Sequence, residues 1–187
     1  MINGTKIRLR NKKLGDVRND YTWQTDAELA QLDATPVLTV GFTEYLLDYV
    51  WELRFPSPSR RRFGIETIDG KHIGNCSYYD IDETKGEAEL GIMIGNRDYW
   101  DKDYGTDTVA TLVNHVFQQT KLNRIHLKTL GSNIRAQKCF TKCGFTPYGH
   151  MASDGYNFVL MELHCKWSQQ RQTANRSLTG SPADEIL

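Results

Sequence analysis

The segment EAELGIMIG carries two carboxylates, Glu87 and Glu89, that alternate with apolar residues. Leu90, Ile92 and Ile94 are expected to share one face of a strand, so both glutamates lie on the opposite face. A carboxylate in that position can take a proton from an amine, directly or through a water molecule. Glu89 is the favoured base, and the alternative is an ordinary charged residue on the wet face of a strand.

The stretch DYWDKDYGTDTV, residues 98 to 109, has the form of a turn that leads into a helix. The first turn of a helix presents free backbone N–H groups and about half a positive charge, so phosphates bind there. Gly105 lets a ligand approach the backbone closely, and Lys102 adds a positive charge. Thr106 is the expected N-cap, and Asp107 is expected in the first turn. A plain turn without a ligand is the alternative.

The remaining reactive side chains indicate no further chemistry. The four cysteines include a pair at helical spacing, Cys139 and Cys143, but no second Cys or His pair follows at zinc spacing, so we expect free thiols. His115 and His126 are expected to be structural or surface residues. Asp80, on the strand before Glu89, is a further candidate base.

Composition limits the class of protein. The chain has 187 residues, a quarter of them charged, and a formal net charge of zero. One soluble domain is expected, with no nucleic acid as the main partner. No apolar run reaches the length of a membrane span and the N-terminus has no signal-peptide pattern, so we expect no membrane association and a cytoplasmic location.

The pattern of elements predicts a mixed α/β sheet. Two helices are clear: Val109, Leu112, Val113, Val116 and Phe117 form one apolar stripe, and the segment SNIRAQKCFTKCGF forms the second helix. Ser132 or Asn133 caps that second helix and Gly144 ends it. Residues 43 to 53 predict a third helix, whereas residues 20 to 37 fit either short helices or an ordered loop. Seven strands are expected in the order β, helices, β, β, β, loop, α, β, α, β, β, followed by a polar and disordered tail from 168 to 187.

The element order, AELGIMIG, YWDKDYGTD and NIRAQKCFTKCGF together resemble the GNAT superfamily of N-acetyltransferases, most closely its RimJ/RimL type. The resemblance covers Thr5 to Trp167 and implies a single acetyl-CoA N-acyltransferase domain over 1–167, with about seven strands and helices on both faces. It implies that the turn before the central helix binds the pyrophosphate of acetyl-CoA and that strand residues 92 to 94 pair with its pantetheine arm. The implied cofactor-binding residues are Ile92, Met93, Ile94, Lys102, Asp103, Tyr104, Gly105, Thr106, Asn133 and Phe140.

Two positions depart from this family pattern. RimJ/RimL relatives typically have Y-W-G-K-G-Y-G-T-E-A at the turn, and Asp101 and Asp103 replace two of those glycines. We expect weaker CoA binding with an unusual salt dependence, because a carboxylate near the pyrophosphate repels it. Many GNAT enzymes carry a tyrosine seven residues after the helix asparagine as the acid for the leaving thiolate, and this chain has Phe140 there. Tyr148 and Tyr156 are the candidate substitutes, and the N–H near Met93 is the candidate oxyanion donor.

The acceptor amine is expected to enter between the early helices and the last hairpin. Acidic and aromatic residues attract a cationic amine, and the early segments provide them. Packing between helices with solvated acids is the alternative role of the same residues. The candidate acceptor-binding residues are Tyr21, Trp23, Asp26 and Tyr45, with Glu28 and Trp51 nearby.

The predicted function is transfer of an acetyl group from acetyl-CoA to a primary amine by direct attack. The acceptor is a protein N-terminus, a polyamine, an amino sugar or a small metabolite. The partners are therefore CoA and an amine, with the protein a monomer or a homodimer. The alternative is a CoA-binding or sensor module on the same fold without turnover, which Phe140, Asp101 and Asp103 favour.

Overall fold

The computed structural model describes residues 1–165, so the predicted tail lies outside the described residues. Within them, eight strands form one mixed sheet in the order β1-β2-β3-β4-β5-β6-β8-β7. The seven predicted strands are confirmed, and the eighth is a two-residue strand at the N-terminus. The strands are β1 (Ile2–Asn3), β2 (Ile7–Asn11), β3 (Arg60–Thr67), β4 (His72–Asp82), β5 (Glu87–Ile94), β6 (Arg124–Leu130), β7 (Thr146–Ser153) and β8 (Tyr156–His164).

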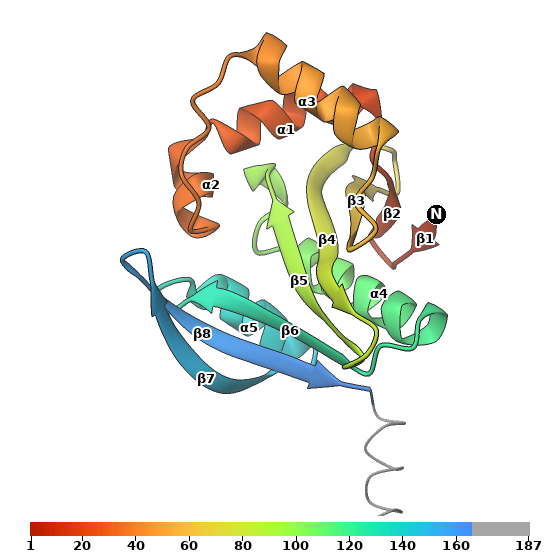
Figure 1. Cartoon of the computed structure of the whole chain (residues 1–187), viewed down its shortest axis with the longest axis vertical. Helices are drawn as coiled ribbons and strands as arrows, with labels where there is room; N and C mark the ends of the chain where they lie inside the picture. The colour runs from red at the N-terminus through yellow and green to blue at the C-terminus, as the bar shows by residue number, and fades with distance from the viewer. Residues whose placement is uncertain (166–187) are drawn as a thin grey trace, which may run out of the picture.

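The helices form two groups (Figure 1). Three early helices gather at one end of the molecule, above the ends of β4 and β5, while α4 and α5 lie along the strands. The early region that fitted helices or a loop is helical over two short stretches. The helices are α1 (Val17–Gln24), α2 (Ala27–Leu32), α3 (Phe42–Arg54), α4 (Tyr104–Gln119) and α5 (Ile134–Lys142), with 3₁₀ turns at η1 (Leu14–Asp16) and η2 (Arg97–Tyr99).

Strands β5 and β6 diverge along their length, as Figure 1 shows. They form a parallel pair only over three residues, from Glu87–Arg124 to Glu89–His126. Arg124 holds the closed end together, because its guanidinium donates to Glu87 at 2.5 Å on β5 and to Glu162 at 2.7 Å on β8. Beyond the third pair the strand edges no longer bond to each other, so backbone groups of both strands face an opening.

Helix α4 begins earlier than its sequence suggests. Asp103 is its N-cap residue in the left-handed conformation, with φ 62°, and its side chain makes no cap hydrogen bond. Thr106 was the expected N-cap; that prediction is wrong, and Thr106 lies in the first turn. The predicted stripe is confirmed, with Val109, Leu112 and Val116 at most 1% exposed.

Asp107 ties the N-terminal strands to α4. Its carboxylate accepts hydrogen bonds from the N–H groups of Thr5 at 3.1 Å, Lys6 at 2.7 Å and Ile7 at 3.1 Å. This contact is in addition to the favourable interaction of an acidic residue with the helix dipole.

Helix α3 packs on α1 rather than on the sheet. Tyr45 and Tyr49 are buried, whereas Val50 is 45% and Leu53 is 37% exposed. The predicted helix is confirmed, and only a narrow stripe of it is buried because α1 covers a narrower surface than a sheet does. None of the helices within residues 1–165 is both long and apolar enough to cross a membrane.

A buried ion cluster joins the early helices to the sheet. Arg10 of β2 makes a bidentate pair with Asp16 at 2.8 Å and a further contact with Glu66 of β3 at 2.5 Å. Asp16 is 1% exposed and precedes α1 directly. These bonds hold the start of α1 against the sheet.

Candidate active site

Two cavities lie on either side of the tip of β5 and share one part of their walls. The first, of about 680 Å³, lies between the early helices and strands β3 to β6. The second, of about 530 Å³, lies between β5, the start of α4 and α5. We call them the acceptor cavity and the cofactor cavity. The residues that line both are Leu32, Asp33, Ile92, Met93, Asn133, Ala136 and Phe140.

The cofactor cavity contains most of the expected cofactor-binding residues. The N–H groups of Tyr104, Gly105 and Thr106 open α4 and have no acceptor inside the helix, because the first helical bond runs from Asp107 N–H to the Asp103 carbonyl. A ligand therefore has donors at the helix start, where the dipole favours an anion. The expected residues that line this cavity are Ile92, Met93, Ile94, Asp103, Gly105, Thr106, Asn133 and Phe140.

The side chains of Lys102 and Tyr104 lie elsewhere. The Lys102 ammonium donates to the Asp98 carbonyl at 2.8 Å, and the Tyr104 ring stands edge-on to Tyr99 with centroids 4.9 Å apart. Neither side chain lines the cofactor cavity. The positive charge expected from Lys102 is therefore directed back to its own turn in this structure.

Asp101 and Asp103 keep the turn that glycine usually makes. Both adopt positive φ, at 55° and 62°. Aspartate tolerates that region better than most residues do. The Asp103 carboxylate pairs with Lys142 of α5 at 2.9 Å, and this hydrogen bond lowers the pKa of Asp103. The negative charge is therefore directed toward a cation and not left facing the helix start.

One face of α5 supplies cations that sequence reasoning missed. Arg135, Lys138 and Lys142 all line the cofactor cavity, and their spacing of three and four residues places them on one helical face. That spacing was the signal that could have identified them. The Arg135 guanidinium lies 3.4 Å from the centroid of the Trp100 ring, whose N–H donates to the Ile94 carbonyl at 2.6 Å.

The cysteine pair of α5 borders the same cavity. Cys139 accepts a hydrogen bond from the Thr106 hydroxyl at 3.7 Å, and both cysteines are free thiols. A hydrogen bond from Cys143 lowers the pKa of Cys139 to about 7. Within residues 1–165, no cluster of three or more His, Cys, Asp or Glu residues is placed to hold a metal ion.

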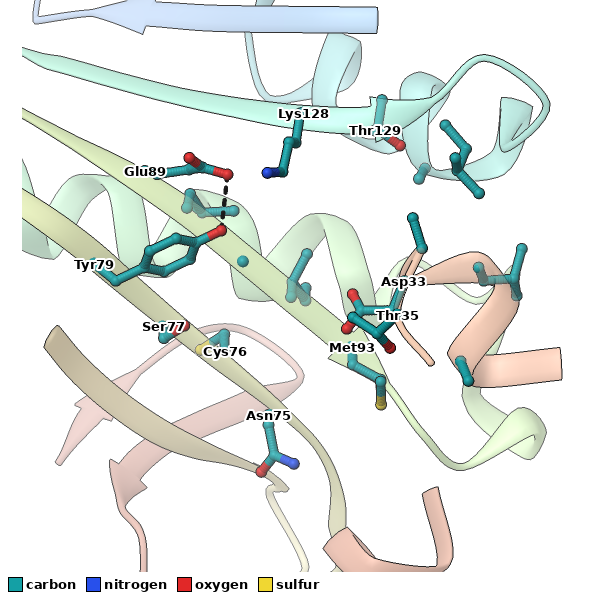
Figure 2. A pocket seen from close by; sticks show the side chains of 18 of the residues that line it. Asp33, Thr35, Asn75, Cys76, Ser77, Tyr79, Glu89, Met93, Lys128 and Thr129 are labelled. Carbon is teal, nitrogen blue, oxygen red and sulfur yellow. Dashed lines mark hydrogen bonds between the residues drawn. The ribbon is translucent and has the colours of Figure 1, made fainter. Parts of the chain in front are cut away.

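The acceptor cavity contains Glu89, oriented by a tyrosine from the neighbouring strand. The Tyr79 hydroxyl donates to Glu89 Oε1 at 2.8 Å (Figure 2). Burial and this bond raise the pKa of Tyr79, so it remains a neutral donor. Lys128 of β6 extends toward Glu89 across the opening between the diverging strands. Tyr79 is a site residue that the sequence did not reveal, because its contact with Glu89 depends on the β4–β5 register.

Of the predicted acceptor-binding residues, Trp23 lines the acceptor cavity and the others do not. The Tyr21 hydroxyl donates to the Val40 carbonyl at 3.1 Å, and the Tyr45 ring packs against the Tyr21 ring between α1 and α3. Asp26 caps α2 by accepting from Leu29 N–H at 3.0 Å. The structure therefore places these three residues outside the cavity, in contacts between and within the helices.

Tyr148 is not placed to act as the acid. It is 46% exposed on the edge strand β7, with the Arg124 guanidinium 5.2 Å from its ring centroid, and it lines neither cavity. That prediction is corrected, because the register of β7 turns the ring toward the closed end of the β5–β6 pair. Tyr156 does line the acceptor cavity, and neither Glu87 nor Asp80 does.

Several polar residues of the acceptor cavity come from segments that carried no motif. Asp33 follows α2, and Asn75 and Ser77 lie on β4. Asp20 is 1% exposed, accepts from Asn75 Nδ2 at 2.7 Å and has the Lys12 ammonium 2.6 Å away. No local pattern distinguishes these residues from ordinary polar positions.

The chain is similar in sequence and in fold to known acetyltransferases. An uncharacterized N-acetyltransferase, p20, of Bacillus licheniformis is 26% identical over 145 residues, which cover 77% of this chain and 81% of the relative. A spermidine N-acetyltransferase from Vibrio cholerae, solved with CoA and spermine, superimposes with a TM-score of 0.75 at 19% identity and covers 86% of this chain and 96% of that one. The aminoglycoside acetyltransferase AAC(6')-Ib, solved with CoA and kanamycin, gives 0.70 at 20% identity, covering 89% and 99%.

The family follows from a match over most of the chain. The fold of the chain is similar to the fold of these solved acetyltransferases. The sequence of residues 6–146 matches the family described as the Acetyltransferase (GNAT) domain. The chain therefore belongs to the GNAT family of acetyltransferases.

Proposed function

We propose that this protein transfers the acetyl group of acetyl-CoA to a primary amine of a small cationic acceptor, with Glu89 as the base. The observation that carries the proposal is the meeting of the two cavities at the tip of β5. An acyl donor bound at the start of α4 and an amine held in the acceptor cavity meet at that shared wall. Direct attack within one ternary complex needs this geometry.

The residues present fit an acyl-CoA donor. The helix start supplies N–H donors to a pyrophosphate, and α5 supplies Arg135, Lys138 and Lys142 along the same wall. A Cβ at Gly105 would meet only Cys139 Sγ at 3.5 Å and Ile94 at 3.9 Å, so the backbone here is open to close approach. The edge of β5 is free of β6 beyond Glu89, and it can pair with an amide-containing arm in the manner of an added strand.

Glu89 is placed to act on the ammonium form in which an amine arrives. Primary amines are protonated near neutral pH, with pKa values near 10.4 for lysine-like groups, and must lose a proton before attack. The Tyr79 bond fixes one carboxylate oxygen of Glu89 and leaves the other for the amine or a water molecule. The backbone N–H of Met93 is the proposed donor to the oxyanion.

A cationic small acceptor is supported by the charges of the acceptor cavity. Two of its cations are already neutralised, since Lys12 pairs with Asp20 and Arg62 pairs with Glu52. In the described part of the chain, the acids Asp33, Glu89 and Asp154 have no ion-pair partner, and neither do the cations Arg60 and Lys128, so the unpaired groups of this cavity are three acids against two cations. The solved relatives that bind spermine and kanamycin also take acceptors with several amines. A protein N-terminus, the acceptor typical of RimJ/RimL enzymes, is the second candidate.

The test combines an acceptor panel with one variant. Purified protein is mixed with acetyl-CoA and spermidine, kanamycin or a peptide with a free α-amine, and free thiol is measured. Turnover is expected with a polyamine or aminoglycoside, and Glu89→Gln is expected to lower kcat about 100-fold with unchanged CoA binding. Tyr79→Phe is expected to give a smaller loss, because the carboxylate remains but is less well oriented.

Each outcome discriminates between the alternatives. Turnover only with the peptide replaces the cationic small acceptor by a protein N-terminus. A protein that is stabilised by CoA but releases no thiol with any amine is a binding module, not an enzyme. Full activity of Glu89→Gln removes Glu89 as the base.

A further inference from the structure

Asp33 lies at the junction of the acceptor cavity and the cofactor cavity. Among residues 1–165 it is the one titratable group that lines both the acceptor cavity and the cofactor cavity. It follows the last residue of α2, and Figure 2 shows it at the Met93 end of the acceptor cavity, away from the Glu89–Tyr79 pair. A group at this junction can face both the attacking nitrogen and the departing sulfur.

The Asp33 carboxyl is free to exchange a proton. In the described part of the chain, no hydrogen bond or ion pair holds it. Asp33 is classed among the exposed residues, yet the protein atoms around the two cavities desolvate its carboxyl, and this desolvation raises its pKa to about 6. Arg60 opposes the shift from across the acceptor cavity. The other charged or titratable groups on the two cavity walls include Tyr79, Glu89, Lys128, Asp154, Asp101, Asp103, Arg135, Lys138 and Lys142.

The proposed reaction requires a second proton acceptor. An ammonium loses two protons in becoming an amide: RNH₃⁺ and the thioester give the amide, CoA–SH and one free proton. Glu89 lies four residues before Met93, which is about 13 Å along a strand. An amine that attacks at the Met93 end therefore passes its first proton to Glu89 through water molecules, and the second proton needs a group nearer to the sulfur. Phe140 stands at the position where many relatives have the acid, and its side chain has no ionisable proton to donate.

Resting on the function proposed above, we propose that Asp33 accepts the second proton and returns it to the leaving thiolate. As the N–C bond forms, the nitrogen gives its proton to the Asp33 carboxylate. As the C–S bond breaks, the carboxyl gives that proton to sulfur, and Asp33 is again a carboxylate. A group with a pKa near the working pH is suited to both steps.

Steady-state kinetics with acetyl-CoA and spermidine test the proposal, with kanamycin as acceptor if it is the better one. Asp33→Asn is expected to lower kcat about 100-fold, while the acceptor KM and the Kd for CoA change less than about threefold. Asp33→Glu is expected to recover part of the loss. Asp48→Asn, an equivalent change on exposed α3 outside both cavities, is the control for charge and is expected to match the wild type.

A measurement without turnover tests the same group. The Asp33 carboxyl carbon is followed by ¹³C NMR against pH, free and with CoA bound, and assigned by its loss in Asp33→Asn. A midpoint near 6 is expected in the free protein, and a midpoint below about 4 with CoA bound overturns the relay because the group would hold no proton.

The kinetic outcomes separate the two proposals. If Asp33→Asn keeps its kcat, or loses affinity for the acceptor alone, the relay is wrong even when Glu89→Gln is inactive. If the wild type acetylates none of the amines, the proposed function fails and the relay fails with it.

Discussion

Asp101 and Asp103 show how a turn tolerates charge next to an anion site. Both take the positive φ that glycine usually supplies, and Asp103 is compensated by Lys142. The two side chains of this ion pair are 58% and 61% exposed, so salt screens their attraction and the pair is weak. Lys142, which compensates the charge of Asp103, is therefore a cation that is not available to the pyrophosphate.

Removing this carboxylate is predicted to strengthen CoA binding. Asp103→Asn keeps a residue that tolerates φ 62° but frees Lys142 for the ligand. We expect the affinity for CoA, measured by calorimetry at low salt, to rise about threefold. The gain should disappear at high salt, where screening removes the charge effect. Unchanged or weaker binding at low salt would show that Asp103 does not oppose the ligand.

Helix α5 combines a structural cap with a position on both cavities. The Asn133 side-chain oxygen accepts from Ala136 N–H at 3.1 Å, which satisfies one free donor of the first turn. The rest of the amide belongs to the shared wall of the cavities. The same residue thus positions the cationic face of α5 and presents a polar group to the ligands.

Two substitutions at Asn133 should separate these roles. Asn133→Asp retains a cap acceptor, so the thermal midpoint should stay close to the wild type, whereas the anion and the lost donor should weaken CoA binding about tenfold. Asn133→Ala should lose about 1 kcal/mol of unfolding free energy as well. Calorimetric unfolding and CoA titration of both variants provide the measurements. Equal stability of the two variants would contradict the capping role.

At the scale of the molecule, two ion clusters determine the shape of the site. Arg124 closes the β5–β6 pair at one end, so the strands diverge toward the other. The Arg10 cluster fixes the early helices over the sheet, and the acceptor cavity is the space between them. Each cluster joins elements that are far apart in the chain.

The Arg10 cluster predicts a pH dependence of stability. The Arg10 bond is the strongest of the favourable contacts that hold the pKa of Asp16 at about 2 against desolvation, compared with an ordinary value near 3.9. A lowered pKa stabilises the fold above the unfolded value, so this contribution is complete above about pH 4 and is lost as pH falls toward 2. Asp16→Asn should cost about 3 kcal/mol at pH 7, because Arg10 loses one of its two buried acidic partners.

Urea unfolding of the wild type and Asp16→Asn from pH 7 to pH 2 measures this contribution. The difference in unfolding free energy between the two proteins should shrink between about pH 4 and 2. Asp48→Asn serves as the control, since its carboxylate is exposed on α3. A difference that stays constant over this range would show that Asp16 is not the linked group.

The sequence by itself determined the elements whose signals are local. The periodic stripe of α4 and the Asn133 cap depend on neighbours within a few residues, and both appear in the structure. Part of the lining of the cofactor cavity follows from local segments, namely β5, the turn before α4 and the start of α4, whereas the cations of α5 were not predicted. The start of α4 was misplaced because aspartate at positive φ gives no clear local signal.

Only the tertiary structure decided the acceptor side. Its wall brings together Asp33, Tyr79, Glu89 and Lys128 from a loop and three strands, and no local pattern encodes their proximity. Tyr21 and Tyr45 have the same residue type whether they bind an amine or pack between helices, and the structure places Tyr21 of α1 against Tyr45 of α3. The register of β7 places Tyr148 on a face that lines neither cavity. Local periodicity specifies an element, but which of its side chains meet another element depends on strand order, divergence and helix docking.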